Sequence, residues 1–417
     1  MRYNEVSLLF LLVSVFSRGS VLLSRLKALR PHEWPIAITL LDDHQSDLER
    51  DRYAVSATIS LLGQAGEFER ALGLFHSVAV PDLALYHSTL VALAKSRQGA
   101  KAESLLWCIT PLDCYSLNLV LMAHRDDWKS SFRIAKAAQT KGVLLDVNNY
   151  FQVISACLDS DQYDEAGKLL IEVQQSLLLK REDAVVKQTF RKILDYFWKT
   201  YSHSRIHSIR ALVSRDPSMG ETNSAATKAL LTALGCAADE GVMRHEHFST
   251  EGARVGYCIQ KINRSIRLAD FLLSATSFDY AVLEHLLALP IVSLGGGPGF
   301  DFVGAAILSD FLHLTGQSFR RRDGVRTLVA DLEPGWQSCV SSFENAMNSL
   351  VTDGIRHHTS FGSCDITKPL SSSPSILQAT AGTSSSVGNF LLIYICNFHA
   401  LNHLLLIYIC KLHWNRQ

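Results

Sequence analysis

Apolar residues recur at helical spacing through most of the first half of the chain, which predicts a series of amphipathic helices. Four segments, beginning at Val55, Tyr86, Tyr115 and Tyr150, repeat one order of apolar, polar and small residues. Their starts lie 31, 29 and 35 residues apart. Apolar residues four and seven positions after each start extend one buried face. These residues are Ile59, Leu90, Leu119 and Ile154, followed by Leu62, Leu93, Met122 and Cys157.

A small residue follows the polar break in each segment, where it allows a second helix to pack closely on the first. The segment Trp34–Leu41 has the same pattern and predicts the second half of an earlier unit. Helix–turn–helix units of this kind bury a continuous core when they stack. The small residues are Ala37, Ala71, Ala102, Ser131 and Ala166.

Residues 20–180, and most typically "ISLLGQAGEFERALGLF", resemble the pentatricopeptide-repeat family. The resemblance implies an α-solenoid that binds single-stranded RNA, one base per repeat. It places the base-reading side chains directly after the first residue of each segment, at Ser56, His87, Ser116 and Phe151. His87 and Phe151 depart from the Asn, Ser or Thr usual in that family. A solenoid that binds protein or acts as a scaffold is the alternative.

Residues 175–215 continue the helical pattern, and their run of aromatic residues predicts a buried core. The polar stretch Arg215–Ser224 predicts a turn or linker. The next segment predicts a short helix that Gly235 ends as a C-cap, and Arg264–Leu289 predicts further helix. The aromatic residues are Phe190, Tyr196, Phe197, Trp198 and Tyr201.

The pattern changes at "PIVSLGGGPGFDFVG", Pro290–Gly304, where a short apolar run precedes glycines and then a helix from Phe300 to about Leu314. A strand, a glycine turn and a helix in this order form the first unit of a doubly wound sheet. Phe300 and Asp301 stand where a P-loop needs lysine and a hydroxyl residue. Phe300 also replaces the third glycine of a dinucleotide fingerprint.

Three further apolar runs predict three more strands. Val325–Trp336 ends in Asp331 and Glu333, and His358–Leu370 contains Asp365. Asn389–Phe398 is the fourth predicted strand. In doubly wound folds an acidic residue after the second strand binds ribose hydroxyls.

The spacing Gly-x-Gly-x-Gly within "LGGGPG" resembles motif I of class I S-adenosylmethionine-dependent methyltransferases, and the resemblance extends over about residues 255–400. It implies S-adenosylmethionine as the cofactor. Asp331 or Glu333 would then bind the ribose, and Asp365 the adenine amino group. Ser293 stands where this family usually has an acid. The implied glycine contacts are Gly295, Gly296, Gly297 and Gly299.

The sequence assigns no catalytic residue. The prolines that follow the fourth strand in amino-group methylases are absent, as is a Pro-Cys nucleophile, and His399 only lies near the expected place. The three strands that normally complete the methyltransferase sheet are also missing. Leu391–Cys396 and Leu405–Cys410 are nearly identical apolar segments, and we expect them to pair with each other or with another chain.

Composition adds little about partners. Lys and Arg total 40, as do Asp and Glu, so net charge favours neither a nucleic acid nor a membrane partner. Nine cysteines without a CxxC pair or zinc spacing indicate reduced thiols and an intracellular protein with no metal site. Ser7–Phe16 is too short for a confident membrane span. It predicts a first helix, an organelle-targeting segment for a mitochondrion or plastid, or a secretory signal.

We therefore predict an α plus α/β fold, an N-terminal helical-repeat α-solenoid followed by an incomplete Rossmann-like doubly wound sheet. The predicted parts are a targeting segment or first helix (1–20), repeats (21–215), a linker with short helices (216–254) and a methyltransferase-like domain (255–417). The predicted function is S-adenosylmethionine-dependent methylation of RNA held by the solenoid. The alternatives are a non-catalytic RNA-binding or scaffold protein, and a methyltransferase acting on protein or small molecules. No DNA-binding motif is present, and cytoplasm or nucleus stays open beside an organelle.

Overall fold

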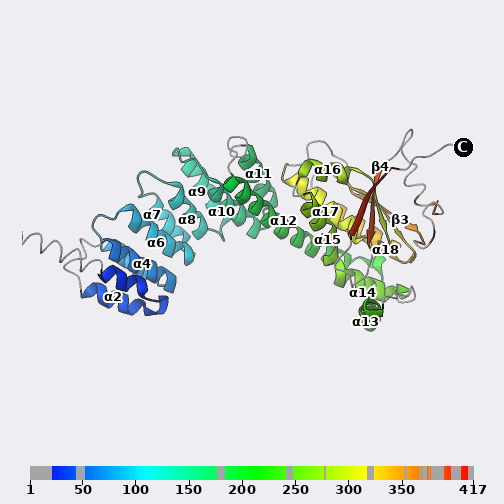
Figure 1. Ribbon diagram of the computed structural model, residues 1–417, viewed down its shortest axis with the longest axis horizontal. Coiled ribbons are helices and arrows are strands. Elements are labelled where there is room, and N and C mark those ends of the chain that lie inside the picture. Colours follow the sequence, from blue (N-terminus) through cyan, green and yellow to red (C-terminus); the bar gives the residue numbers. More distant parts are fainter. Residues whose placement is uncertain are drawn as a thin grey trace, which may run out of the picture. The chain divides into compact units, whose positions relative to one another are not determined.

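A computed structural model describes residues 21–43, 52–175, 184–240, 248–276, 279–316, 324–351, 355–365, 368, 373–374, 376, 389–395 and 405–411. Contacts divide the chain into an N-terminal region, Met1–Leu194, and a C-terminal region, Asp195–Gln417 (Figure 1). The division falls within the long helix α12 (Ala184–Val213). The N-terminal targeting segment and His399 lie outside the described residues, and the four-part division stays a prediction.

The N-terminal region is a series of helix pairs. A helix at residues 21–28 precedes the short 3-10 helix η1 (Pro31–Glu33) and α2 (Trp34–Asp42). Four complete units follow, each with a first helix, called an A helix, and a second, called a B helix. The A helices are α4 (Arg52–Ala65), α6 (Leu83–Lys95), α8 (Cys114–Ala123) and α10 (Val147–Asp159). The B helices are α5 (Phe68–His76), α7 (Gly99–Leu106), α9 (Trp128–Thr140) and α11 (Tyr163–Val173).

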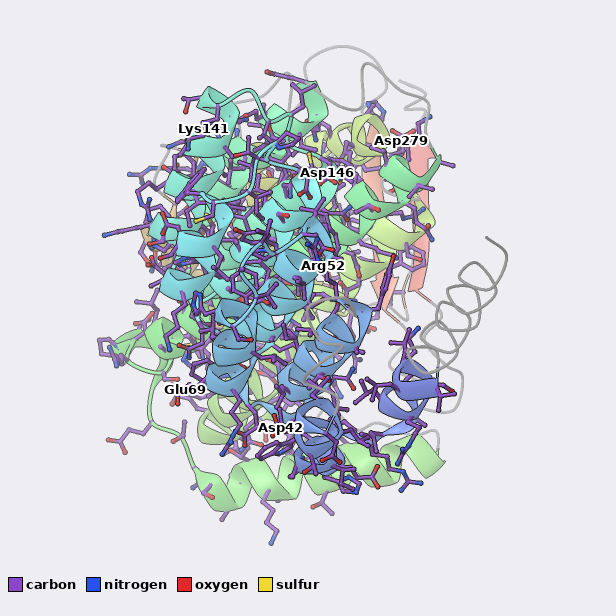
Figure 2. The ribbon with its side chains drawn as sticks, turned by 90° about the vertical axis from the view of Figure 1, so that its left-hand side faces the viewer. Asp42, Arg52, Glu69, Lys141, Asp146 and Asp279 are labelled. Atoms are coloured by element: carbon purple, nitrogen blue, oxygen red, sulfur yellow. The ribbon has the colours of Figure 1, made fainter. Side chains whose placement is uncertain are left out.

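Aspartates begin three of the A helices. The side chains of Asp82, Asp113 and Asp146 accept hydrogen bonds from backbone N–H groups three residues on, at 3.0, 2.8 and 2.8 Å. Such caps satisfy donors that have no partner within the helix. Figure 2 labels Asp146 at the start of α10. These caps mark where the second, third and fourth units begin, independently of the apolar pattern.

The helices stack as the small residues predict. Each A helix packs against its own B helix and against the A helix of the next unit. All five small residues, Ala37, Ala71, Ala102, Ser131 and Ala166, are fully buried, so this expectation is confirmed. A Cβ added to Gly63 of α4 would lie only 2.6 Å from the Cβ of Ala92 in α6, which shows how closely these two helices approach. The N-terminal region is thus a helical repeat.

The third unit begins in a different register from the one that the aromatic residues indicate. Tyr115 is 53% exposed and Met122 is 39% exposed, although the sequence pattern placed both on the buried face. Ser116 is fully buried. Counted from the helix caps, Leu117 rather than Tyr115 is equivalent to Tyr86 and Tyr150. The reason is that α8 has 10 residues whereas α6 and α10 have 13, so the unit is shortened within its first helix.

The C-terminal region combines helices with one sheet. Its helices are the second part of α12, then η3 (Pro217–Met219), α13 (Ser224–Glu240), α14 (Glu251–Lys261), η5 (Ile262–Ser265), α15 (Ile266–Ala275), α16 (Tyr280–Ala288), α17 (Phe300–Leu314) and α18 (Trp336–Leu350). Its strands are β1 (Ile291–Leu294), β2 (Arg326–Asp331), β3 (His358–Ser363), β4 (Asn389–Ile395) and β5 (Leu405–Lys411). The helix predicted to end at Gly235 continues to Glu240, so that prediction is wrong. No helix among the described residues is long and apolar enough to cross a membrane.

The strands are arranged in the order β3-β2-β1-β4-β5. The first four are parallel, with Ile291 beside Thr327 of β2 and Leu391 of β4. All four lie where the sequence predicts strands. β5 runs antiparallel to β4, so the two similar C-terminal segments pair with each other. The chain changes direction across the sheet after β3, and the carboxyl end of β1 therefore lies at a topological switch point.

Helix α17 is the centre of the core in this region. Its Phe311 is fully buried and its ring contacts Phe197, Trp198 and Tyr201 of α12 at centroid distances of 5.5, 5.3 and 6.0 Å. The predicted role of these α12 aromatic residues as core is confirmed. A Cβ added to Gly304 would lie 2.0 Å from the backbone oxygen of Ser265, so α17 also needs glycine where η5 crosses it.

Candidate functional sites

The first candidate site is the exposed face of the four A helices. Counted from the first residue of each A helix, Ser56, His87, Asn118 and Phe151 occupy equivalent positions, separated by 31, 31 and 33 residues. All four side chains are half-buried, so each unit presents one of them at the surface. Three of the four residues predicted to read bases are thus at equivalent positions. The fourth, Ser116, is replaced at this position by Asn118.

Ser116 is buried and forms contacts between helices instead of facing solvent. Its hydroxyl donates a hydrogen bond to Oδ2 of Asp113 at 2.7 Å, and Nε2 of His87 lies 3.0 Å from the same hydroxyl. The His87 ring also packs edge-on against Tyr115 at 4.8 Å. Burial raises the pKa of Asp113, but the hydrogen bonds from Ser116 and His87 outweigh it and lower that pKa below its ordinary value. These contacts join α6 to α8.

Asn118 is the residue that the apolar pattern missed. Its Nδ2 lies 3.8 Å from Sδ of Met122. Its Oδ1 is shielded from solvent and has no hydrogen-bond partner among the described residues. Native structures rarely leave such an oxygen unpaired. The spacing of Asp82, Asp113 and Asp146 would have identified the position from sequence.

The second candidate site is the glycine turn after β1. Gly295, Gly297 and Gly299 have φ angles of 63, 53 and 90°, a region that residues with a Cβ rarely adopt. The turn carries the backbone to the start of α17, where N–H groups and the helix dipole favour an anion or a polar ligand. The N–H of Gly297 donates to Oδ2 of Asp331 at 2.9 Å. The turn and the acid predicted from sequence are therefore in direct contact.

The sheet brings the predicted acidic residues to the same edge. Asp331 is the last residue of β2, and its carbonyl accepts a hydrogen bond of 2.9 Å from the N–H of Cys364, which directly follows β3. Asp365 is the next residue along the chain after Cys364. Burial raises the pKa of Asp331 above its ordinary value, against hydrogen bonds from the N–H groups of Glu333 and Gly297. Asp365 is half-buried and lies 3.3 Å from the Lys368 ammonium.

Glu333 is engaged by other groups. Its Oε1 lies 3.3 Å from Nη1 of Arg254 and accepts a hydrogen bond from the N–H of Gly335 at 2.9 Å. Only 7% of the residue is exposed. Arg254 also donates to the carbonyl of Phe248 at 2.6 Å. This arrangement holds the loop after β2 against α14, and it leaves Asp331 and Asp365 as the carboxylates that best fit a ligand role.

Ser293, which stands where the methyltransferase family usually has an acid, contacts a buried acid. Its hydroxyl donates to Oδ2 of Asp301 in α17 at 2.5 Å, and both residues are buried. Burial raises the pKa of Asp301 to about 6. A Cβ added to Gly296 would lie 2.5 Å from the Ser293 hydroxyl oxygen, so the turn packs directly over this pair. A carboxyl group is thus present beneath the turn, supplied by the helix instead of the strand.

The glycine turn, Asp331 and Asp365 lie at the carboxyl ends of β1, β2 and β3, with the Gly297 N–H bonded to the Asp331 carboxylate. Within the described ranges, no group of three or more His, Cys, Asp or Glu side chains is placed to hold a metal ion. His399 lies outside these ranges.

No protein-family model matches the chain, and no curated protein matches its sequence. Among solved structures the chain is similar to the crystal structure of the pentatricopeptide repeat protein PPR10 from maize. The sequence identity is 17% and the TM-score is 0.34. The match covers 79% of this chain and 48% of that one, so the chain spans about half the length of the structure that it matches. The N-terminal region is identified as a helical repeat by the packing of its helices and by its sequence periodicity.

Proposed function

We propose that the N-terminal region binds single-stranded RNA through the exposed face of its A helices. The observation that carries this proposal is the equivalent placement of Ser56, His87, Asn118 and Phe151, one in each successive unit. Hydroxyl, imidazole and amide groups hydrogen-bond to base edges, and aromatic rings stack on base faces. A row with one such side chain per unit matches a strand whose bases follow one another at regular intervals.

Two further features of this face support the proposal. The half-buried side chain of Asn118 carries both an amide donor and an amide acceptor, the two kinds of group that a base edge pairs with. Tyr53 and Tyr115 occupy equivalent positions in the first and third complete units and are 74% and 53% exposed. Exposed aromatic rings at regular intervals are typical of surfaces that bind single strands without strict sequence preference.

The test is fluorescence anisotropy with labelled single-stranded and double-stranded RNA of mixed sequence. We expect the single strand to bind more tightly, and the double variant Asn118→Leu, Phe151→Ala to weaken it by about tenfold or more. Lys101→Gln, which changes an exposed cation on the B helix α7, is the matched control and retains the wild-type affinity. Equal binding by the double variant and wild type, or no binding to any RNA, contradicts the proposal.

A second candidate function concerns the C-terminal region, and we propose that its glycine turn binds an adenosyl ligand such as S-adenosylmethionine. Three observations support it: the positive φ angles of the turn, its position at the switch point of the sheet, and the bond between Gly297 and Asp331. S-adenosylmethionine would supply an electrophilic methyl group. The residues named here would only bind and orient S-adenosylmethionine. If the methyl acceptor is the bound RNA, the protein would be an RNA methyltransferase.

Calorimetric titration of S-adenosylmethionine into the full chain tests the second candidate. We expect micromolar binding that Gly297→Arg abolishes and Asp365→Ala weakens. Lys261→Gln, at a half-buried position at the end of α14, is the control, and unfolding curves confirm that each variant is folded. No binding by a folded wild-type chain contradicts this candidate and leaves a repeat protein that binds RNA without the cofactor.

A further inference from the structure

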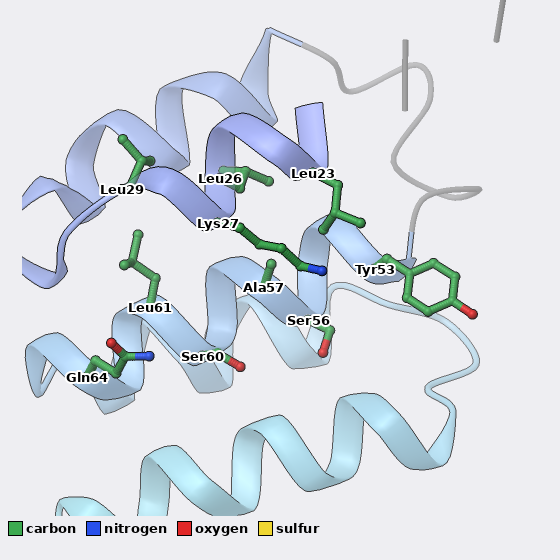
Figure 3. A pocket seen from close by; sticks show the side chains of 10 residues that line it. All are labelled: Leu23, Leu26, Lys27, Leu29, Tyr53, Ser56, Ala57, Ser60, Leu61 and Gln64. Carbon is green, nitrogen blue, oxygen red and sulfur yellow. The ribbon is translucent and has the colours of Figure 1, made fainter. Parts of the chain in front are cut away.

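The pocket between the helix at residues 21–28 and α4 belongs to the proposed RNA-binding face, because Tyr53 and Ser56 line it (Figure 3). Strand β5 of the C-terminal region has no such role. It is an edge strand in the sheet order β3-β2-β1-β4-β5, and no described strand pairs with its outer side. An edge strand presents one row of backbone N–H and C=O groups with which another strand can pair.

The two edges of this sheet differ in sequence. β3, at the opposite edge, reads His-Thr-Ser-Phe-Gly-Ser, and its residues His358, Ser360 and Ser363 are exposed. β5 reads Leu-Leu-Ile-Tyr-Ile-Cys-Lys, with no charged residue or proline before Lys411. Proteins usually protect an edge that faces solvent with charges, proline or a bulge, and an apolar edge without them readily accepts another strand. The sequence of β5 therefore indicates a strand with a partner on its outer side.

β5 already pairs with a near copy of itself inside the chain. The segment Leu-Leu-Ile-Tyr-Ile occurs at residues 391–395 of β4 and again at residues 405–409 of β5. The antiparallel register sets Ile393 opposite Ile407, which is the same residue of the two copies. The flanking pairs repeat in reverse order on either side, so a local two-fold axis passes between these two isoleucines. The segment is thus complementary to itself in antiparallel pairing.

A second copy of the chain offers the same segment in the same conformation. When the β5 strands of two copies pair about a true two-fold axis, Ile407 lies opposite its counterpart. The flanking residues then form the same pairs as those between β4 and β5. Such an interface is isologous, because both copies use the same surface. It also closes at two copies, since each contributes one apolar edge and the polar β3 edge stays free.

We propose that two copies of this chain associate through antiparallel pairing of their β5 strands, which joins the two five-stranded sheets into one continuous sheet. The partner is a second copy instead of a strand from a different protein, because the same segment reproduces the register that β4 and β5 show. The dimer requires neither bound RNA nor S-adenosylmethionine, so it goes beyond both proposed functions.

Sedimentation velocity of the full chain over a range of concentrations measures this association. Wild type should form a dimer that dissociates on dilution, with no larger species. Ile407→Lys and Ile407→Glu should each weaken the dimer by about tenfold or more, because like charges then face each other at the two-fold axis. An equimolar mixture of the two variants should dimerise again, since opposite charges then face each other. Ser360→Lys, at an exposed position of β3, is the control and should dimerise as wild type does.

Recovery of the dimer in the mixture excludes misfolding as the cause of its loss in either variant. A wild-type chain that stays monomeric at its highest soluble concentration would overturn the inference. A dimer that both Ile407 variants retain would overturn it too, as would folded variants whose mixture stays monomeric. Mass that keeps rising with concentration beyond the dimer would show open-ended aggregation of the apolar edge and would also overturn it.

Hydrogen–deuterium exchange of wild type adds a measurement that needs no variant. Exchange at residues 405–411 should be slower at concentrations where the dimer predominates than at concentrations where the monomer does, because pairing protects the outer row of amides. Exchange at residues 358–363 of β3 should be equal in both. Dimer formation without any slowing at residues 405–411 would place the interface elsewhere and contradict the inference.

Discussion

The two regions of the chain are stabilised over different distances along the sequence. In the N-terminal region, A helices contact their own B helices and the next A helix, as repeat proteins do. In the C-terminal region, Arg205 of α12 donates to the carbonyl of Leu350 at 3.0 Å, across 145 residues. Trp198 donates to Asp270 at 2.7 Å across 72 residues. A destabilising substitution should therefore affect only neighbouring helices in the repeat, whereas in the C-terminal region it should destabilise the whole region.

The largest expected effect is that of Phe311→Ala. Removing this fully buried ring leaves a cavity among Phe197, Trp198 and Tyr201 and should cost about 3–5 kcal/mol of unfolding free energy. Urea unfolding, monitored by hydrogen–deuterium exchange, should show that the whole C-terminal region opens at a lower urea concentration than in wild type. Phe271→Ala, at a residue 40% exposed, is the control. Earlier opening confined to α17 would contradict the contrast between the regions.

In the N-terminal region, Leu90→Ala should cost about 2–5 kcal/mol because the side chain is fully buried in α6. Exchange should increase in α6 and its neighbours α4 and α8, and less in α10. Leu144→Ala, at a residue 87% exposed, should change nothing measurable. A uniform increase across the whole chain in the Leu90→Ala variant would show that the repeat does not behave as a local array.

Asp301 should make the C-terminal region less stable as pH rises. Burial raises its pKa to about 6 in the folded state, so the folded protein holds this proton more tightly than the unfolded chain. Stability from this group is full below about pH 4 and is lost as pH rises from there through about 6, at a cost of roughly 2–3 kcal/mol. The difference in urea midpoint between wild type and Asp301→Asn should show this trend. A pH-independent difference would contradict it.

The smallest expected effect is that of Arg133→Ala in the repeat. Arg133 is 58% exposed and forms paired hydrogen bonds of 2.8 Å with both carboxylate oxygens of Glu103. These bonds are the largest cause of the lowered pKa of Glu103. Exposed ion pairs contribute little and salt screens them. Thermal unfolding should show a slight decrease that disappears at high salt, and a decrease that persists there would indicate a packing role for Arg133.

Local patterns predicted much of both regions. The helical period predicted the buried small residues Ala71 and Ala166. The apolar runs predicted the strands of the sheet, and the glycine turn predicted the start of α17. The third repeat unit was placed wrongly because Tyr115 resembles the opening residue of its neighbours. The Asp113 cap, which depends on backbone geometry, determines the start of α8.

Other features depend on contacts that no local pattern contains. Gly235 is a plausible C-cap by type, yet α13 continues past it to Glu240. The pairing of Glu333 with Arg254 joins residues 79 positions apart. The position of Asp301 below the turn requires α17 to pack on β1, so sequence alone indicated only that Ser293 departs from a family pattern.

Hydrogen–deuterium exchange of the full chain, with and without saturating single-stranded RNA, tests most directly whether the A-helix face is the binding surface. The account predicts slower exchange in α4, α6, α8 and α10 and at residues 21–28, with little change in α5, α7, α9 and α11. Slower exchange confined to the B helices or to the C-terminal region, or no change at saturation, would contradict it.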